Sequence, residues 1–315
     1  MDTIKQSGSQ NCDGGNHALP HITICICTYQ RPALLRRLLL DLGRQETENQ
    51  FTCSIAVADN DAQESARQSV RECATASGME ITYLVEPRRS ISFARNKSIE
   101  PANGDFIAFI DDDEFPAADW LLKMFLAWRA HTPAGVFGPV RPHYDEATPT
   151  WVKKAGFYER PEHPTGFVMP WRECRTGNVL VARGILKSLE PVFRSQFGGG
   201  ASDQDTFRRL MELGHRFIWC NEAIVFEVVP QSRCKRKFLI RRAILGGSIS
   251  LRHPKGRLLN ITKAILALPV YVLLLPFLQL GGHHLFMKYL VKLCNHLGRL
   301  LALLGFEPVQ VRDMQ

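Results

Sequence analysis

The first half of the chain alternates short apolar runs with stretches whose apolar positions recur at helical spacing. The apolar runs predict strands at residues 21–28, 53–58, 81–85, 106–110 and 177–182. The helical spacing predicts helices over residues 32–42, 66–76, 92–99 and 119–130, and a further helix that begins near Ser202. Because short links join the alternating strands and helices, the fold class is α/β, with a mainly parallel sheet covered on both faces.

Polar residues follow the first four predicted strands. Ligands of parallel sheets bind beyond the carboxyl ends of the strands, so these residues are candidates for one crevice. They occupy positions 28–31, 59–61, 86–88 and 111–113. Each segment alone would also suit an Asx turn or a helix cap, and only the recurrence favours a binding site.

The fourth of these segments consists of three consecutive aspartates after the apolar run FIAFI. Alternation along a strand would point Asp111 and Asp113 to one face and Asp112 to the other. Two adjacent carboxylates suit Mg²⁺, which proteins usually hold with one or two carboxylates and the phosphate oxygens of a substrate. The motif therefore predicts metal-bridged phosphate chemistry. The alternative is a solvated acidic turn after a buried strand.

Three glycines at positions 198–200 lead into the predicted helix at Ser202. Ser202 and Asp205 fit an S-x-x-D capping box, which is a structural role. This arrangement would leave Asp203 free to project toward the crevice as a general base.

Charge divides the chain into two parts. Residues 1–227 carry a net charge of −4 and residues 228–315 a net charge of +12, and no Asp or Glu occurs from 228 to 306. Residues 264–280, AILALPVYVLLLPFLQL, are 17 residues long and contain two prolines. They are marginal as a membrane span, and an interfacial or re-entrant segment is an equal alternative. The spacing over 285–306 predicts a helix that lies at an interface.

Basic residues beside an apolar segment indicate an anionic membrane surface and the cytoplasmic face. The alternative is a buried helical hairpin that covers the rest of the protein. Nucleic acid is not expected as a partner, because the basic region has no recognisable nucleic-acid motif and is joined to an apolar stretch. The predicted organisation is a flexible tail over 1–20, an α/β domain over 21–227 and a membrane-associating helical region over 228–315.

Residues 1–20 lack the basic start and apolar core of a signal peptide, so the catalytic part is expected in the cytoplasm. Nine cysteines without a C-x-x-C pair are predicted to be free thiols, with Cys25 and Cys27 on one face of a buried strand.

The motifs of this chain, and their order along it, resemble those of family 2 glycosyltransferases with the GT-A (nucleotide-diphospho-sugar transferase) fold. The resemblance covers about residues 22–216 and rests on ITICICTYQRPALLRRLL, VADND, SISFARNKSI, FIDDDEFP, RTGNVLVAR and GGGASDQDTFRRLMELGHR. One position departs from the family pattern, because Ser202 stands where a Glu usually precedes the catalytic Asp. The segment VFEVVPQSRCKRKFLIRRAILGG is similar to members that extend lipid-linked exopolysaccharide units.

The resemblance implies inverting transfer of a sugar from a nucleoside diphosphate sugar, with a UDP-sugar as the expected donor, to a hydroxyl of a glycan acceptor. It implies an acceptor linked to polyprenyl diphosphate at the cytoplasmic face of the inner membrane. Asp203 would be the catalytic base, and Asp113 with Asp111 would hold Mg²⁺ or Mn²⁺. The donor nucleotide would contact Thr28, Tyr29, Asp59, Arg95 and Asp111.

Two other functions are compatible with parts of the sequence. Haloacid-dehalogenase-like phosphatases also carry D-x-D after an apolar strand. Their motif lies on the first strand, however, and a small or hydroxyl residue stands where this chain has Phe115. A non-catalytic nucleotide-sugar-binding membrane protein is the other alternative, because Ser202 replaces the usual Glu.

Overall fold

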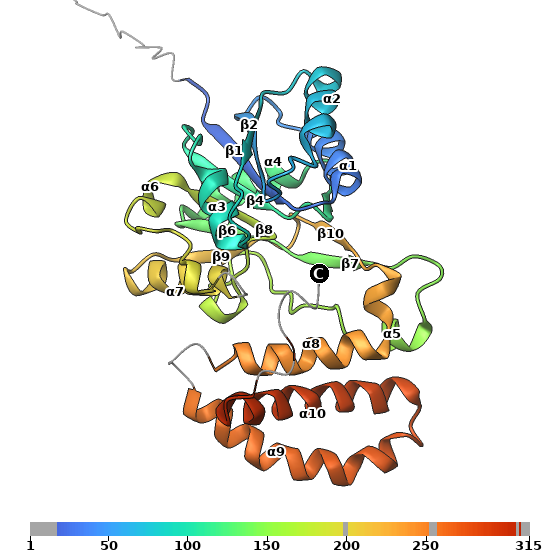
Figure 1. Cartoon of the computed structure of the whole chain (residues 1–315). Helices are drawn as coiled ribbons and strands as arrows, with labels where there is room; N and C mark the ends of the chain where they lie inside the picture. The colour runs from blue at the N-terminus through green and yellow to red at the C-terminus, as the bar shows by residue number, and fades with distance from the viewer. Residues whose placement is uncertain (1–17, 198–200, 252–256, 307–308, 310–315) are drawn as a thin grey trace, which may run out of the picture.

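Two β-sheets form the centre of the α/β part of the protein (Figure 1). The computed structural model describes residues 18–197, 201–251, 257–306 and 309. Most of the predicted tail and the glycines at 198–200 therefore lie outside the described residues.

The larger sheet has seven strands and is mainly parallel, as predicted. In spatial order its strands are β3 (Ile81–Val85), β2 (Thr52–Asp59), β1 (His21–Thr28), β4 (Phe106–Ile110), β8 (Asn178–Ala182), β6 (Gly135–Phe137) and β9 (Phe217–Trp219). The first four pair in parallel, and β8 runs antiparallel to both of its neighbours. The smaller sheet has the order β5 (Glu114–Pro116), β10 (Val225–Val228) and β7 (Val140–His143).

Helices cover both faces of the larger sheet. Successive side chains of a strand point to opposite faces, so Ile24 of β1 packs into one buried cluster and Cys25 into another. On the first face lie α1 (Pro32–Leu42), α2 (Arg67–Ser77) and α4 (Trp120–His131). On the second lie α3 (Ile91–Ile99), α6 (Arg183–Leu186) and α7 (Ser202–Glu212). Eight cysteines are described and all are free thiols, as predicted.

After β10 the described residues form helices. The 3₁₀ helix η3 (Gln231–Cys234) leads into α8 (Arg236–Ile249), α9 (Arg257–Leu278) and α10 (His283–Leu303). The helix over the apolar segment thus begins at Arg257, earlier than the apolar run alone indicated. In Figure 1 these three helices form a layer below the sheets.

An apolar cluster joins this helical layer to the α/β part. Leu239 of α8 and Val291 of α10 pack with Val152 of α5 (Thr150–Ala155) and with Tyr158. The rings of Trp151 and His283 are 5.1 Å apart, which adds an aromatic contact at the start of α10. The helices are therefore packed on the body of the protein.

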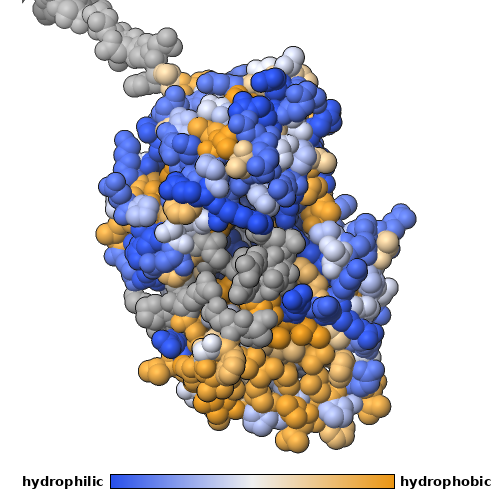
Figure 2. Space-filling view, in the orientation of Figure 1, coloured by the Kyte–Doolittle hydropathy of each residue, from blue (hydrophilic) through white to orange (hydrophobic). Residues whose placement is uncertain are grey.

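The outermost helix, α9, is apolar and exposed. Exposed fractions of its side chains include 66% for Leu266, 71% for Leu273 and 69% for Phe277. By length and composition alone α9 could cross a membrane, and Ala264 is its one buried residue among those that the structure describes. Figure 2 shows hydrophobic side chains gathered at this end of the molecule. The helical layer therefore contacts the α/β part through α8 and α10, while α9 is not buried as the buried-hairpin alternative required.

Candidate active site

The carboxyl ends of β1, β2 and β4 bring the predicted site residues to one edge of the sheet. Thr28 pairs with Asp59 in the parallel register of β1 and β2. Across the other side of β1, the Thr28 hydroxyl donates a 2.8 Å hydrogen bond to Oδ2 of Asp112. The polar residues that follow these strands in the sequence thus lie together in the structure.

Asp111, Asp112 and Asp113 form a turn. The strand β4 ends at Ile110, and the Glu114 amide donates to the Asp111 carbonyl at 3.1 Å. One Arg31 nitrogen lies 3.2 Å from Oδ1 of Asp112 and 3.2 Å from Oδ2 of Asp113. The predicted alternation was therefore wrong, because the pleat stops before these residues and Asp112 shares a cation with Asp113.

A chain of ion pairs leads from Asp113 into the smaller sheet. Arg233 lies 3.4 Å from Oδ2 of Asp113 and 3.0 Å from Oε1 of Glu227 in β10. Arg160 pairs with the other Glu227 oxygen at 2.7 Å. Asp113 is consequently held on one oxygen by two arginines, Arg31 and Arg233.

Burial controls the protonation of the acidic turn. It raises the pKa of Asp111 to about 6, with Asp113 adding to the rise and Arg95 opposing it. Burial likewise raises the pKa of Asp112 to about 6, with Asp113 adding and Arg31 opposing. The pKa of Glu114 is raised well above its ordinary value by burial and by Asp111.

Gly177 leaves room for the carboxyl groups of the buried Glu114 and the partly buried Asp111. A Cβ atom at position 177 would lie 2.5 Å from Oε1 of Glu114 and 3.3 Å from Oδ2 of Asp111. Glu114 in turn accepts a 2.9 Å hydrogen bond from the Asp111 amide. A glycine directly before β8 is therefore what allows Glu114 to accept the hydrogen bond that supports the acidic turn.

The donor set at the turn suits a divalent cation that is completed by phosphate. Among the described residues no cluster of three or more His, Cys, Asp or Glu side chains makes a full protein cage. Asp113 uses only Oδ2 for its arginines, and within the described ranges no hydrogen bond reaches the Asp111 carboxylate. Two such carboxylates with free oxygens fit Mg²⁺ or Mn²⁺ bound together with a diphosphate.

Asp59 shapes the loop that follows β2. Its carboxylate is fully buried and accepts hydrogen bonds from the amides of Asp61 (3.0 Å) and Ala66 (2.9 Å) and from the Tyr83 hydroxyl (2.7 Å). Beside this loop, the Arg89 guanidinium carbon lies 4.5 Å from the centre of the Tyr29 ring. Direct contact between Asp59 and a nucleotide stays a prediction.

Arg95 links the acidic turn to the start of α7. Its guanidinium donates a 2.9 Å hydrogen bond to the Ser202 hydroxyl and lowers the pKa of Asp111. Ser202 is buried, and its position is the one where the family pattern has Glu. The hydroxyl thus serves as an acceptor for Arg95.

The predicted capping box at the start of α7 was wrong. Ala201 is the N-cap residue, and no side chain caps the helix. The buried Asp205 instead forms ion pairs with Arg194, Arg208 and Arg209 at 2.9 to 3.4 Å. Three arginines on one carboxylate explain why Asp205 does not turn back to the helix end.

Asp203 lies on the opposite side of this helix start, next to the 3₁₀ helix η1 (Trp171–Glu173). Its side chain is 9% exposed, and Oδ1 accepts only the amide of Gln204 at 2.8 Å within the described chain. The Gln204 side chain donates to the Arg172 carbonyl of η1 at 2.7 Å. Asp203 therefore keeps accepting capacity where α7 meets η1.

A cavity of about 460 Å³ opens beside these elements. We call it the sheet cavity. Its wall contains Arg172 and Arg175 from the segment around η1, Arg160 and Glu227 from the ion-pair chain, and Phe157 with Arg242 toward the helical layer. The cavity therefore extends from η1, which the Gln204 side chain of α7 contacts, past the ion-pair chain to Arg242 of α8, and neither Asp203 nor Asp113 is among its lining residues.

Sequence reasoning missed three residues of this site. Glu114 was part of the acidic motif, but its burial depends on Gly177 from a distant segment. Arg31 was noted only as a strand-end residue, and Arg233 only as part of the basic region. Their pairing with Asp113 depends on tertiary structure and left no local signal.

The chain is similar in sequence to a protein family and to individual proteins of known role. Residues 23–178 match the family model described as Glycosyl transferase family 2. The succinoglycan biosynthesis protein ExoM of Rhizobium meliloti (strain 1021) is 35% identical over 243 residues, which are 76% of this chain and 75% of that protein. The glycosyltransferase AglE of Haloferax volcanii is 30% identical over 105 residues, 33% of this chain and 34% of its own length.

Solved structures share the fold. The mannosyltransferase PcManGT from Pyrobaculum calidifontis, in complex with GDP-Man and Mn²⁺, has a TM-score of 0.63 at 20% identity, covering 92% of this chain and 89% of that one. S. aureus TarS 1-349 in complex with UDP-GlcNAc has a TM-score of 0.54 at 15% identity, covering 92% and 93%.

Proposed function

The chain belongs to glycosyl transferase family 2, and from this premise we propose that it transfers a sugar from a nucleoside diphosphate sugar, a UDP-sugar, to a hydroxyl of a glycan acceptor in exopolysaccharide synthesis. One observation carries the proposal. Arg95 connects the acidic turn after β4 to the start of α7, so the diphosphate end and a candidate base belong to one site.

The donor half of the site is assigned to the strand ends. Asp113 and Asp111 would hold Mg²⁺ or Mn²⁺, which when bound offsets the negative charge that develops on the departing diphosphate. Arg31 and Arg233 keep positive charge beside the same turn. The nucleotide would lie along Thr28, Tyr29 and Arg95, with Asp59 fixing the loop that borders it.

Asp203 is assigned as the general base. It would take the proton of the acceptor hydroxyl as that oxygen attacks the anomeric carbon and the bond to the diphosphate breaks. A single displacement of this kind inverts the configuration at that carbon. The free accepting capacity of Asp203 beside η1 supports the assignment, and Ser202 replaces the usual Glu by holding Arg95.

The acceptor half is assigned to the sheet cavity. Its volume of about 460 Å³ lies within the usual range for small-molecule sites. The similarity to ExoM, a succinoglycan biosynthesis protein, supports an exopolysaccharide acceptor, and the exposed apolar α9 supports a location at a membrane. We propose that this acceptor is a glycan carried on polyprenyl diphosphate at the cytoplasmic face. We expect α9 to be the membrane contact.

Incubation with a panel of nucleotide sugars and an extract of lipid-linked glycans tests the proposal. Release of nucleoside diphosphate together with transfer of label to lipid is the expected result. Release of inorganic phosphate would instead favour the phosphatase alternative. Tight nucleotide binding with no turnover on any acceptor would favour the non-catalytic alternative. Family membership favours glycosyl transfer over both.

A further inference from the structure

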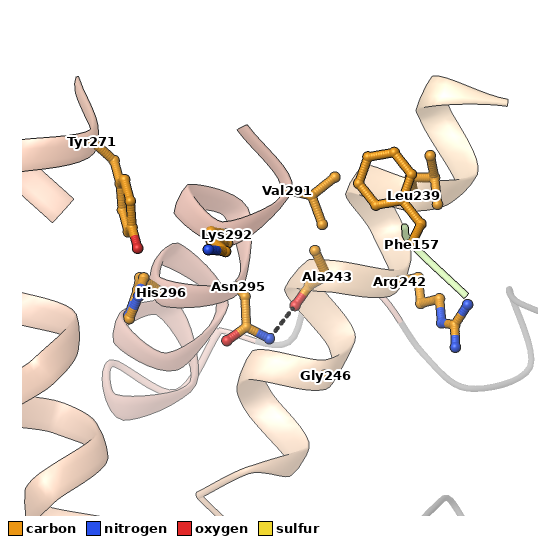
Figure 3. A pocket seen from close by; sticks show the side chains of 10 residues that line it. All are labelled: Phe157, Leu239, Arg242, Ala243, Gly246, Tyr271, Val291, Lys292, Asn295 and His296. Atoms are coloured by element: carbon orange, nitrogen blue, oxygen red, sulfur yellow. Dashed lines mark hydrogen bonds between the residues drawn. The ribbon is translucent and has the colours of Figure 1, made fainter. Parts of the chain in front are cut away.

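A second cavity lies within the helical layer. It has a volume of about 460 Å³ and is lined by side chains of α8, α9 and α10 together with Phe157 (Figure 3). We call it the helix cavity. Figure 3 shows Tyr271 and His296 toward one end of it and Phe157 and Arg242 toward the other.

Positive charge in the helix cavity is not neutralised by carboxylates. Arg242 and Lys292 line it, and neither forms an ion pair in the part of the chain that the structure describes. Their cationic groups instead lie over aromatic rings, Arg242 at 5.1 Å from Tyr158 and Lys292 at 4.8 Å from Tyr289. No Asp or Glu occurs between residues 228 and 306, so these helices supply no competing anion.

The rest of the lining combines apolar and hydrogen-bonding groups. Leu239, Val291 and Phe157 are apolar, while Asn295 donates one hydrogen bond to the Ala243 carbonyl at 3.2 Å. Tyr271 comes from α9, whose opposite side is the exposed apolar surface. A ligand with an anionic head and a hydrocarbon chain fits this composition better than a purely polar or purely apolar one.

The helix cavity adjoins the sheet cavity. Phe157 and Arg242 line both of them, so these two side chains form the shared wall. A molecule that extends from the helix cavity into the sheet cavity would pass Arg242 before it reaches Glu227, which lines the sheet cavity alone. This order matches a lipid, then a diphosphate, then a sugar.

We infer that the helix cavity binds the diphosphate group of the lipid-linked acceptor through Arg242 and Lys292. The prenyl chain leaves along α9 and α10, and the glycan passes Phe157 into the sheet cavity. This inference rests on the proposed function, because it assigns the lipid end of the same acceptor. Arg242 and Lys292 are binding residues and take no part in proton transfer.

Binding of farnesyl diphosphate to the full-length protein tests the inference without any turnover. Calorimetry below the critical micelle concentration should give weaker binding for R242Q and for K292Q, by about three- to tenfold each, and by more than tenfold for the double variant, because each loses a charge-assisted contact. R242K should retain most of the affinity. K288Q is the matched control, since Lys288 is an exposed residue of α10 that does not line the cavity.

Three further binding measurements, with farnesol, inorganic pyrophosphate and UDP, show which part of the ligand the helix cavity recognises. Farnesol and inorganic pyrophosphate should each bind at least tenfold more weakly than farnesyl diphosphate. UDP binding should stay within twofold in every variant, which reports an intact fold. Equal farnesyl diphosphate affinity in the double variant, or equal affinity for farnesol, would overturn the inference.

The outcomes separate this inference from the transferase proposal. If farnesyl diphosphate binding depends on Arg242 and Lys292 but no nucleotide sugar is turned over, the helix cavity assignment holds and the transferase proposal fails. If a nucleotide sugar is turned over and the double variant binds farnesyl diphosphate normally, the transferase proposal holds and the helix cavity assignment fails.

Discussion

At the scale of single residues, the three aspartates after β4 are not equivalent. Asp112 is buried between Thr28 and Arg31, and Asp113 is tied to two arginines. Asp111 is partly buried beside Glu114, and within the described residues its carboxylate has no ion pair or hydrogen bond that would offset its negative charge. The three carboxylates have different surroundings because the backbone turns after Ile110. Substitutions of Asp111 and of Asp113 should therefore have different effects.

Asp111→Asn should stabilise the metal-free protein at pH 8. Burial raises the pKa of Asp111 from 3.8 to about 6 in the folded state, so the folded state binds more protons between these values and stability falls as pH rises through them. Removing the ionised carboxylate should raise the free energy of unfolding by about 1 to 3 kcal/mol. Urea unfolding with EDTA, at pH 8 and at pH 4, measures it.

The stability gain of Asp111→Asn should disappear at pH 4, where the wild-type carboxyl is protonated. Asp119→Asn, on the exposed Asp119–Lys123 pair, is the control and should change little at either pH. A loss of stability at pH 8 would contradict the burial argument.

Asp113→Ala should weaken nucleotide binding in a metal-dependent way. The variant removes one of two carboxylates available to the cation, and leaves Arg31 and Arg233 to face the diphosphate directly. Titration with UDP should show at least tenfold weaker binding in Mn²⁺ and a small difference in EDTA. An equal loss in both buffers would remove Asp113 from the metal site.

Asp203→Asn should abolish transfer and preserve donor binding. The amide is isosteric but cannot accept a proton, so turnover should fall by about 10² to 10⁴-fold. UDP affinity should remain within twofold, because Asp203 faces η1 and the acceptor side. Near-normal turnover would exclude Asp203 as the base, and the Asp119→Asn control should retain full activity.

At the scale of helices and strands, the sequence predicted the elements with clear periodicity. The strands at 21–28, 81–85 and 106–110 agree with the structure at both ends, and the main helices agree within a residue. Short strands such as β6 and β9 were missed, since three residues carry no usable period. The helix at Ser202 was expected, but its capping was not, because the arginines that engage Asp205 come partly from elsewhere in the chain.

The close packing of α8 on α10 depends on glycine. A Cβ atom at Gly298 would lie 2.1 Å from the Ile244 carbonyl oxygen, and one at Gly247 would lie 2.1 Å from the Asn295 carbonyl oxygen. Both obstacles are backbone atoms, which cannot rotate away. The helices approach each other through these two positions.

Gly298→Val should separate α8 from α10 and destabilise the helical layer by about 1 to 3 kcal/mol. Gly246→Ala is the matched control on the same helix pair, because its Cβ would meet only the Asn295 side chain at 3.4 Å. Thermal unfolding and limited proteolysis after β10 measure the effect. Equal protease resistance of the two variants would contradict the packing argument.

At the scale of the whole molecule, the described residues of the acidic segment 1–227 and of the basic segment 228–315 form opposite ends of the structure. The acidic turn and Asp203 lie in the α/β part, whereas Arg242, Lys292 and the apolar α9 lie in the helical layer. Figure 2 shows the hydrophobic side chains gathered at the end of the molecule that holds this layer. Composition predicted this division. It could not predict that two cavities would adjoin at Phe157 and Arg242, since the residues that line them come from segments far apart in the chain.

The arrangement of α9 favours a helix that lies along the membrane surface over one that spans it. The Tyr271 ring packs 5.8 Å from Tyr289 of α10, so the two helices are joined. Lys288 and Lys292 belong to that same α10 and would enter the bilayer with a spanning α9, at a high cost in desolvation. An interfacial α9 would keep these cations at the level of lipid phosphates.

Membrane binding should therefore depend on the outward side chains of α9. Leu266, Leu273 and Phe277 are 66% to 71% exposed and should insert into the interface. Burying each contributes up to about 1.5 to 3 kcal/mol, so replacing all three with Gln should lower flotation with anionic liposomes at least tenfold. Leu213→Gln is the matched control, because Leu213 is 58% exposed at the end of α7 in the α/β part. Undiminished flotation of the triple variant would show that α9 is not the membrane contact, whereas a loss limited to that variant would identify it.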